Sequence, residues 1–137
     1  MAVVLDASTA LSAVLPDENS NFGRTALAQA LREELLVPTL WFYDVQNGLA
    51  MACRNGRIDN KTAEDALAAL RLLPARVKAP RFGQEFALAR NHALTAYDAA
   101  YLAVALRADA TLATLDRELR RAAVAEHIAL FDESAPA

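Results

Sequence analysis

Short apolar runs alternate along this chain with longer segments in which apolar residues recur every three or four positions. Runs of the first kind are typical of buried strands, and the second spacing is typical of amphipathic helices. The pattern predicts strands over residues 2–5, 35–37, 76–78, 111–115 and 128–131. It predicts helices over residues 10–15, 22–31, 40–54, 62–73, 82–92, 97–107 and 118–126.

Polar residues at the helix starts support these boundaries. Ser8 or Thr9 is expected to cap the first helix, and residues 19–21 are expected to form a turn before the second. Thr95 is expected to cap a helix that is apolar on almost every side and should therefore be buried. Apolar strands that alternate with helices favour an α/β fold with a mostly parallel sheet covered on both faces.

Length and composition limit the class of protein further. The 137 residues suit a single domain over residues 1–137, and a hydrophobic content of 55% is too high for a disordered chain. Since no apolar run reaches the roughly 18 residues of a membrane span, no membrane association is expected. Met1 leads directly into the first strand, which leaves no room for a cleaved signal peptide. The single cysteine, Cys53, forms no internal disulfide and fits the cytoplasm.

The charge distribution is more informative than its total. A formal net charge of −3 does not by itself indicate a nucleic-acid-binding protein. Basic residues nevertheless cluster in two stretches, 71–81 and 117–121. Each stretch is either a solvated helix face or a surface that contacts phosphate groups, and the sequence leaves both interpretations open.

Four aspartates interrupt otherwise apolar sequence, namely Asp6, Asp44, Asp98 and Asp116. Asp6 and Asp116 follow predicted strands, and open α/β sheets bind their ligands at the carboxyl ends of strands. Each has an ordinary explanation as well, as a helix cap, as a partner of the helix dipole or as a surface acid. The apolar flanks of Asp44 and Asp98 are typical of buried helix faces, where a carboxylate needs a partner. Because no Lys or His is regularly placed beside the four, a divalent cation is the expected partner.

Three further polar residues are close enough in sequence to serve the same site. Asn47 follows Asp44 by three positions and so shares its helix face. Ser8 lies two positions after Asp6, and Thr114 lies two positions before Asp116. The alternatives are helix capping for Ser8 and strand packing for Thr114, and both alternatives remain open.

The segments around the four aspartates, in this order and spacing, resemble the PIN-domain family and within it most closely the VapC-type toxins. The matching segments are residues 3–11, 37–49, 94–105 and 113–119. Any one of them is weakly specific, but the four together span nearly the whole chain. One position departs from the family pattern, which usually has Glu where this chain has Asp44.

The resemblance implies a three-layer α/β/α domain with the activity of a Mg²⁺- or Mn²⁺-dependent ribonuclease, the toxin of a type II toxin–antitoxin pair. It implies that Asp6, Asp44, Asp98 and Asp116 are the catalytic, metal-binding acids. Because the Asp44 side chain is one methylene shorter than Glu, Asp44 would bind through a water or need its helix to lie closer to the metal. It also implies an RNA substrate, a homodimer and a cognate antitoxin.

Other functions remain to be weighed against this one. A phosphoacceptor receiver domain needs an acidic pair after the first strand and a Lys at the last, and a dehalogenase-type phosphatase needs an Asp where Ser8 stands. Neither pattern is present. A PIN nuclease of RNA processing and a non-catalytic PIN-like binding module remain as alternatives.

Overall fold

The computed structural model describes residues 1–18 and 20–134, and these form a parallel sheet with helices on both sides. The strands are β1 (Ala2–Leu5), β2 (Glu34–Pro38), β3 (Ala75–Lys78) and β4 (Thr111–Ala113). The helices are α1 (Ala7–Val14), α2 (Asn21–Arg32), α3 (Trp41–Arg54), α4 (Asn60–Arg71), α5 (Gln84–His92), α6 (Ala96–Ala108) and α7 (Arg117–Ala125).

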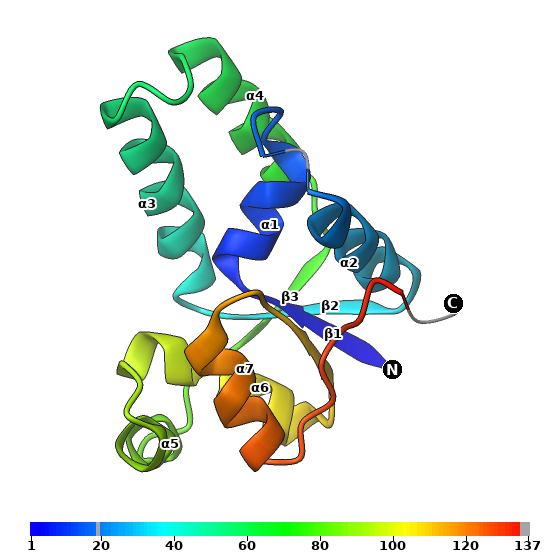
Figure 1. The fold of residues 1–137 in the computed structure, drawn as a ribbon, viewed down its shortest axis with the longest axis vertical. Coiled ribbons are helices and arrows are strands. Elements are labelled where there is room, and N and C mark those ends of the chain that lie inside the picture. The colour runs from blue at the N-terminus through cyan, green and yellow to red at the C-terminus, as the bar shows by residue number, and fades with distance from the viewer. Residues whose placement is uncertain (19, 135–137) are drawn as a thin grey trace.

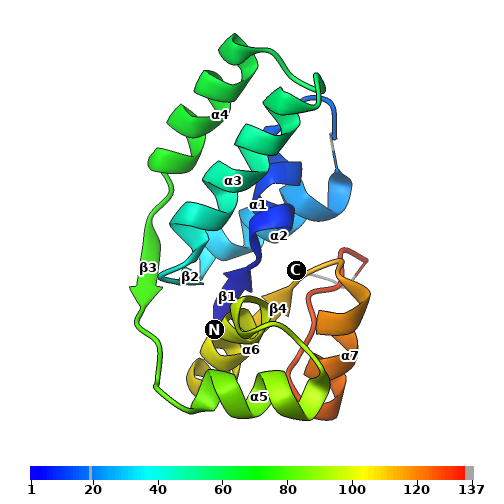
Figure 2. The same ribbon diagram turned by 90° about the vertical axis from the view of Figure 1, so that its left-hand side faces the viewer.

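The sheet confirms the expected fold class. Its strand order is β3-β2-β1-β4, and every neighbouring pair is parallel. Helices α1–α4 lie on one side of it and α5–α7 on the other, which makes three layers (Figures 1 and 2). Because β1 and β4 are adjacent and parallel, the residues that follow them emerge at the same edge of the sheet.

The core lies where the strands meet the helices on each face. Strands β1 and β2 are buried almost throughout, as their continuous apolar sequences predict. Helix α6 is the most deeply covered helix, with every residue from Ala99 to Ala105 buried. The expectation from its nearly uniform apolarity is therefore correct. Within the described residues, no helix has both the length and the apolarity needed to cross a bilayer.

Three local predictions differ from the structure. Residues 128–131 do not form a strand, since only an isolated parallel bridge joins Leu130 to Leu112. Strand β4 ends at Ala113, two residues before the predicted end. Helix α1 begins at Ala7 and is capped by Asp6, because the Asp6 carboxylate accepts a hydrogen bond from the Thr9 N–H at 2.8 Å. The cap is thus neither of the two hydroxyl residues expected from the sequence.

The predicted turn before α2, over residues 19–21, lies only partly within the described residues. Ser20 caps this helix, with its hydroxyl accepting from the Gly23 N–H at 3.1 Å. Residue 19, which was part of the predicted turn, lies outside the described residues. Thr95 caps α6 as predicted, accepting from the Asp98 N–H at 3.0 Å.

Candidate metal site

The four aspartates singled out in the sequence line one cavity. It has a volume of about 190 Å³ and lies at the edge of the sheet where β1 and β4 end. We call it the acid cavity and define it by Asp6, Asp44, Asp98 and Asp116. Segments separated by up to 110 positions in the sequence therefore meet at this edge.

Asp6 is the most enclosed of the four carboxylates. It directly follows β1 and has an exposed fraction of 7%. One carboxylate oxygen accepts from the Thr9 N–H, and the other accepts from the Thr114 hydroxyl. Burial raises the pKa of Asp6 above its ordinary value, the charge of Asp116 raises it further, and both hydrogen bonds oppose the rise.

Thr114 connects Asp6 to Asp116. Its side chain is completely buried, and its hydroxyl donates to Asp6 while accepting from the Asp116 backbone N–H at 3.0 Å. Arg120 donates to the Thr114 carbonyl oxygen at 2.8 Å, which fixes the same turn from the side of α7. Thr114 therefore contacts both acids that follow strands, in addition to packing in the core.

Asp116 is the exposed acid of the set. Its carboxylate caps α7 by accepting from the Leu119 N–H at 2.9 Å. As with Asp6, the capping interpretation and the cavity interpretation hold for the same residue. A cap uses one carboxylate oxygen and leaves the other available.

Asp98 is influenced by the charges of the other three acids. It lies in the first turn of α6 and is half-buried. Partial burial raises the pKa of Asp98, and the charges of Asp116, Asp44 and Asp6 raise it further, while the Thr95 hydroxyl acts in the opposite direction. The acids are thus near enough to repel one another, which is the electrostatic setting that a bound cation relieves.

Asp44 is held by a residue that the sequence analysis did not assign to the site. The Tyr101 hydroxyl donates to Asp44 Oδ2 at 2.9 Å across the gap between α6 and α3. Tyr101 also lines the acid cavity, and its side chain is only 1% exposed. Burial and then the neighbouring Asp44 charge raise the pKa of Tyr101 well above its ordinary value, so the hydroxyl remains a donor. Its position three residues after Asp98 puts both residues on one helix face, but this spacing alone does not assign a buried tyrosine to a site.

Ser8 and Asn47 lie where the sequence placed them. Both are exposed and both line the acid cavity. Ser8 does not cap α1, because Asp6 does so. Their side chains thus add a hydroxyl and an amide to the carboxylate lining.

The lining has the donor chemistry of a site for a hard cation. Carboxylate, amide and hydroxyl oxygens are the ligands that Mg²⁺ and Mn²⁺ prefer, and Mg²⁺ commonly keeps several waters and uses few protein carboxylates. Among the described residues, no three His, Cys, Asp or Glu side chains are gathered into a compact metal-binding cluster. The acids instead surround a cavity, so the residues present fit a hydrated divalent cation better than a fully protein-coordinated one.

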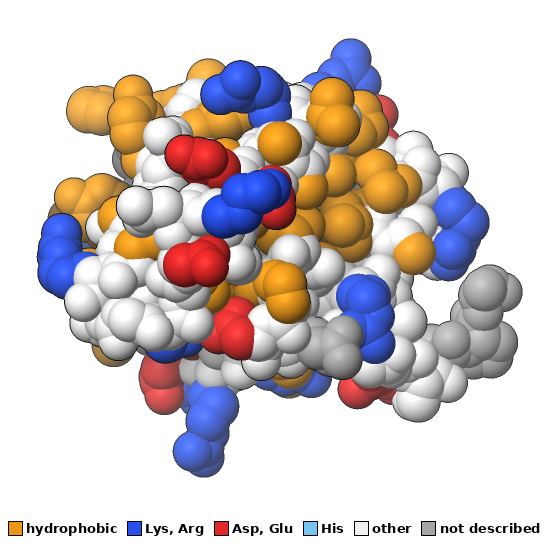
Figure 3. Space-filling model, turned by 90° about the horizontal axis from the view of Figure 1, so that it is seen from above, with side chains coloured by type: hydrophobic (Ala, Val, Ile, Leu, Met, Phe, Trp, Pro, Cys, Tyr) orange, Lys and Arg blue, Asp and Glu red, His pale blue; other side chains and the backbone are white. Residues whose placement is uncertain are grey.

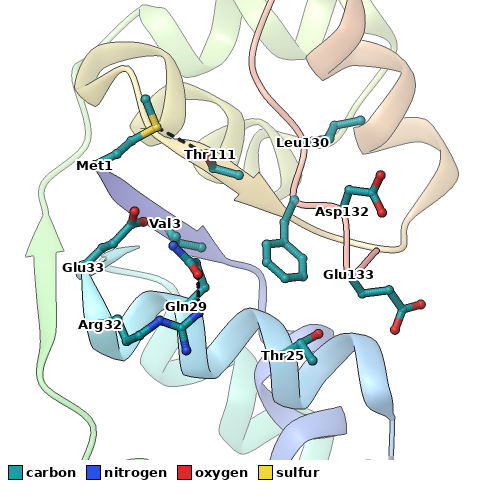
Figure 4. Close-up of a pocket in the computed structure, with 11 residues that line it drawn as sticks. Met1, Val3, Thr25, Gln29, Arg32, Glu33, Thr111, Leu130, Asp132 and Glu133 are labelled. Atoms are coloured by element: carbon teal, nitrogen blue, oxygen red, sulfur yellow. Dashed lines mark hydrogen bonds between the residues drawn. The ribbon is translucent and has the colours of Figure 1, made fainter. Parts of the chain in front are cut away.

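Two of the hollows that are larger than the acid cavity differ from it in chemistry. One, of about 360 Å³, lies near the starts of β1 and β4. Its lining combines the basic side chain of Arg32 with acidic side chains. Figure 4 shows two hydrogen bonds in this lining, from Arg32 to Gln29 and from Thr111 to the Met1 sulfur. The other, of about 650 Å³, is an apolar groove beside α5 and α6, and Phe82, Phe86 and Tyr97 are among its lining residues.

Comparisons with known proteins agree with the geometry. A family model described as PIN domain matches residues 3–125. Ribonuclease VapC3 from Pyrobaculum aerophilum is 36% identical over 123 residues, which cover 87% of this chain and 92% of that protein.

Two solved structures also resemble this one. PAE2754 from Pyrobaculum aerophilum has a TM-score of 0.63 at 27% identity and covers 89% of this chain and 79% of its own. FitAcB from Neisseria gonorrhoeae has a TM-score of 0.67 at 18% identity, covering 96% and 97% respectively. At 18% identity the second likeness bears on the fold alone.

Proposed function

The chain belongs to the PIN domain family, and on that premise we propose that it is a divalent-metal-dependent endoribonuclease, the toxin of a type II toxin–antitoxin pair. The observation that carries the proposal is the meeting of four aspartates around one cavity at the carboxyl edge of a parallel sheet. The similarity to a ribonuclease over most of both chains supports RNA as the substrate.

In this proposal Asp6, Asp98 and Asp116 hold Mg²⁺ or Mn²⁺, and Asp44 completes the acidic lining. When bound, such a cation lowers the pKa of a water molecule and stabilises negative charge on the attacked phosphate. Burial and then the charges of the neighbouring acids raise the pKa of Asp98, and the repulsion among these acids supports the assignment because a bound cation relieves it. Ser8 and Asn47 line the same cavity and serve to orient water or substrate there.

RNA enters as a single strand or a loop, since a flexible backbone reaches a recessed cavity more readily than a rigid duplex. Arg117 directly follows Asp116 and is exposed, so its guanidinium is placed to contact a phosphate group near the acid cavity. Which RNA sequence the enzyme cuts depends on such contacts around the acid cavity and on the shape of the cavity opening.

Partner proteins are the second part of the proposal. An antitoxin and a second copy of this chain each need apolar surface, and the chain exposes several large hydrophobic side chains on α2–α4, including Leu31, Met51 and Leu67. Figure 3 shows hydrophobic side chains that gather over one part of the molecule, with acidic and basic side chains around them. The apolar groove, with Phe82 fully exposed, offers a second such surface for a homodimer.

We further propose that residues 1–137 act as one functional unit and that the protein works in the cytoplasm. The match of the family model to residues 3–125 supports the first statement. The single half-buried cysteine, Cys53, supports the second, because a reducing compartment leaves it as a thiol.

The test is cleavage of single-stranded RNA by the purified protein with Mg²⁺ or Mn²⁺, and with EDTA as control. Cleavage that EDTA abolishes and either metal restores supports the nuclease. Binding of RNA without cleavage under every metal condition would instead identify a non-catalytic binding module.

A PIN nuclease of RNA processing would give the same result as a toxin in this cleavage assay. Expression in a host cell separates the two: a toxin arrests growth, and co-expression of a small adjacent reading frame relieves the arrest. An RNA-processing enzyme needs no such neutralising partner.

A further inference from the structure

We propose that Tyr101 is a positioning residue of the acid cavity, whose hydroxyl fixes the Asp44 carboxylate relative to the other acids. This inference rests on the proposed function, because the quantity that Tyr101 controls is the affinity of the acid cavity for a divalent cation. Tyr101 itself is not a ligand in this proposal.

One hydrogen bond connects two elements of the site. Tyr101 belongs to α6, three residues after Asp98, and its hydroxyl donates to Asp44 on α3 at 2.9 Å. Tyr101 lines the acid cavity together with Asp6, Asp44 and Asp98. Helices α3 and α6 therefore meet at one hydroxyl, and each of them carries a site aspartate.

The direction of this hydrogen bond follows from its chemistry. A carboxylate can only accept, so the phenol hydroxyl gives its proton to Asp44. This bond uses Asp44 Oδ2. The other carboxylate oxygen, Oδ1, is not part of this bond and can face a cation or a water in the cavity. A carboxylate fixed through one oxygen keeps one orientation, whereas an unfixed one is distributed over several rotamers.

The Tyr101 hydroxyl is the side-chain donor that holds the Asp44 carboxylate. Asp44 itself lies in the first turn of α3. Tyr101, by contrast, is rigidly held, since its side chain is 1% exposed and lies within the buried stretch of α6. The tyrosine is thus the fixed partner and the aspartate the one that is positioned.

The first experiment is a calorimetric titration of Mn²⁺ into the wild type and Tyr101→Phe. The substitution removes one oxygen and keeps the ring. We expect the affinity for Mn²⁺ to fall by about 10–100-fold, the range seen when a group behind a metal ligand is removed. The turnover number for RNA should fall with it, while the KM for RNA should not change.

The chain supplies matched controls in its other two tyrosines, Tyr43 and Tyr97, which directly precede Asp44 and Asp98. Their exposed fractions are 78% and 71%. Tyr43→Phe and Tyr97→Phe remove the same atom from the residue that precedes a site acid in the sequence. Both variants should bind Mn²⁺ as the wild type does.

A double-mutant comparison separates positioning from packing. If Tyr101 acts through Asp44, Tyr101→Phe should have no further effect on Mn²⁺ affinity in an Asp44→Ala background. An equal loss in both backgrounds would overturn the inference, as would wild-type affinity in Tyr101→Phe alone. If the wild type neither binds Mn²⁺ nor cleaves RNA, the proposed function fails and this inference fails with it.

Circular dichroism in EDTA verifies that the variants fold. Should Tyr101→Phe fail to fold, the double variant with Asp44→Ala should regain the fold, because removing both partners of a hydrogen bond costs less than removing one. A double variant that also fails to fold would contradict the inference, since the hydroxyl would then be needed apart from Asp44.

Discussion

At the scale of single residues, the aspartates of the acid cavity combine a structural and a chemical position. Asp6 and Asp116 cap the helices that follow their strands, and both line the cavity. A cap stabilises its helix by about 1 kcal/mol. Removing either carboxylate therefore weakens a helix as well as the site, so these two are poor choices for isolating the role of the charge.

Asp98 is the better choice, because Thr95 rather than Asp98 caps its helix. We expect Asp98→Asn to abolish metal-dependent cleavage while the protein keeps its fold. Without metal, the variant should melt a few degrees higher than the wild type, because one of the mutually repelling charges is gone. Cleavage assays and calorimetry in EDTA measure the two effects, and undiminished cleavage would rule Asp98 out of the site.

The stability gain of Asp98→Asn should depend on pH. The pKa of Asp98 is raised in the fold, so the folded state holds this proton more tightly than the unfolded chain does. Its favourable contribution is present at low pH and is lost as pH rises through the raised pKa. The melting difference between variant and wild type should thus be largest near neutrality and close as the pH falls toward about 4. A difference that does not change with pH would mean that the charge of Asp98 is not its source.

Asp44 and Tyr101 mark the limit of prediction at this scale. The four aspartates could be picked out because acids in apolar sequence are rare and two of them follow strands. Tyr101 could not, since a tyrosine in a buried helix is ordinary and its bond to Asp44 joins residues 57 positions apart. Only the tertiary fold, which brings this part of α6 to α3, places the two side chains together.

At the scale of elements, the turn from β4 to α7 determines the geometry of half the site. Thr114 is buried there between two carboxylate-bearing residues, donating to Asp6 and accepting from the Asp116 N–H. Because one hydroxyl makes both hydrogen bonds, replacing Thr114 with valine, which has the same shape but no hydroxyl, removes both of them.

We expect Thr114→Val to destabilise the protein by about 1–3 kcal/mol, because it leaves a buried Asp6 oxygen and the Asp116 N–H without their partner. Thr114→Ser keeps the hydroxyl and serves as the matched control. Urea unfolding of both variants gives the comparison. Equal stability of the two would indicate that the methyl group, not the hydroxyl, matters.

The contact between α1 and α2 depends on a missing side chain. A Cβ atom added at Gly23 would lie 2.1 Å from the Ser12 hydroxyl oxygen and 2.9 Å from the Ala13 backbone nitrogen. At Gly48 the corresponding close neighbour is the end of the flexible Leu11 side chain, at 2.4 Å. Backbone cannot yield as a side-chain end can.

Gly23→Ala should therefore cost about 1–3 kcal/mol of stability, since α1 and α2 must move apart. Gly48→Ala should cost clearly less, because rotation of Leu11 makes the space. Denaturant midpoints of the two variants test the order, and the reverse order would contradict this account of the packing.

The elements themselves were largely predictable, and the exceptions have physical causes. Strands β1 and β2 read correctly because they are buried on both faces and continuously apolar. The predicted strand at 128–131 has the same kind of sequence, but it forms only a single bridge with Leu112. Its larger hydrophobic side chains pack against the core instead of belonging to a paired strand. Phe131 packs edge-on against Phe22 of α2, with ring centroids 5.4 Å apart. An apolar run shows that a segment is covered, not that it pairs along its length.

At the scale of the whole molecule, a bound cation should hold together segments that are remote in sequence. We expect Mg²⁺ or Mn²⁺ to raise the melting temperature of the wild type, since a ligand that binds only the folded state stabilises it, by about 2.7 kcal/mol at a hundredfold excess over Kd. Asp98→Asn should show little of this shift. Scanning calorimetry with metal and with EDTA makes the measurement, and no shift in the wild type at saturating metal would count against the site.

The distance in sequence between Asp6 and Asp116 has a consequence during synthesis. The first of them is synthesised 110 residues before the other, which follows the Thr114 that orients it. A chain that stops before β4 thus leaves β1 without one of its neighbouring strands and the acid cavity without Asp116. The message that encodes the protein is exposed to a completed site only after the codon of Asp116 has been read.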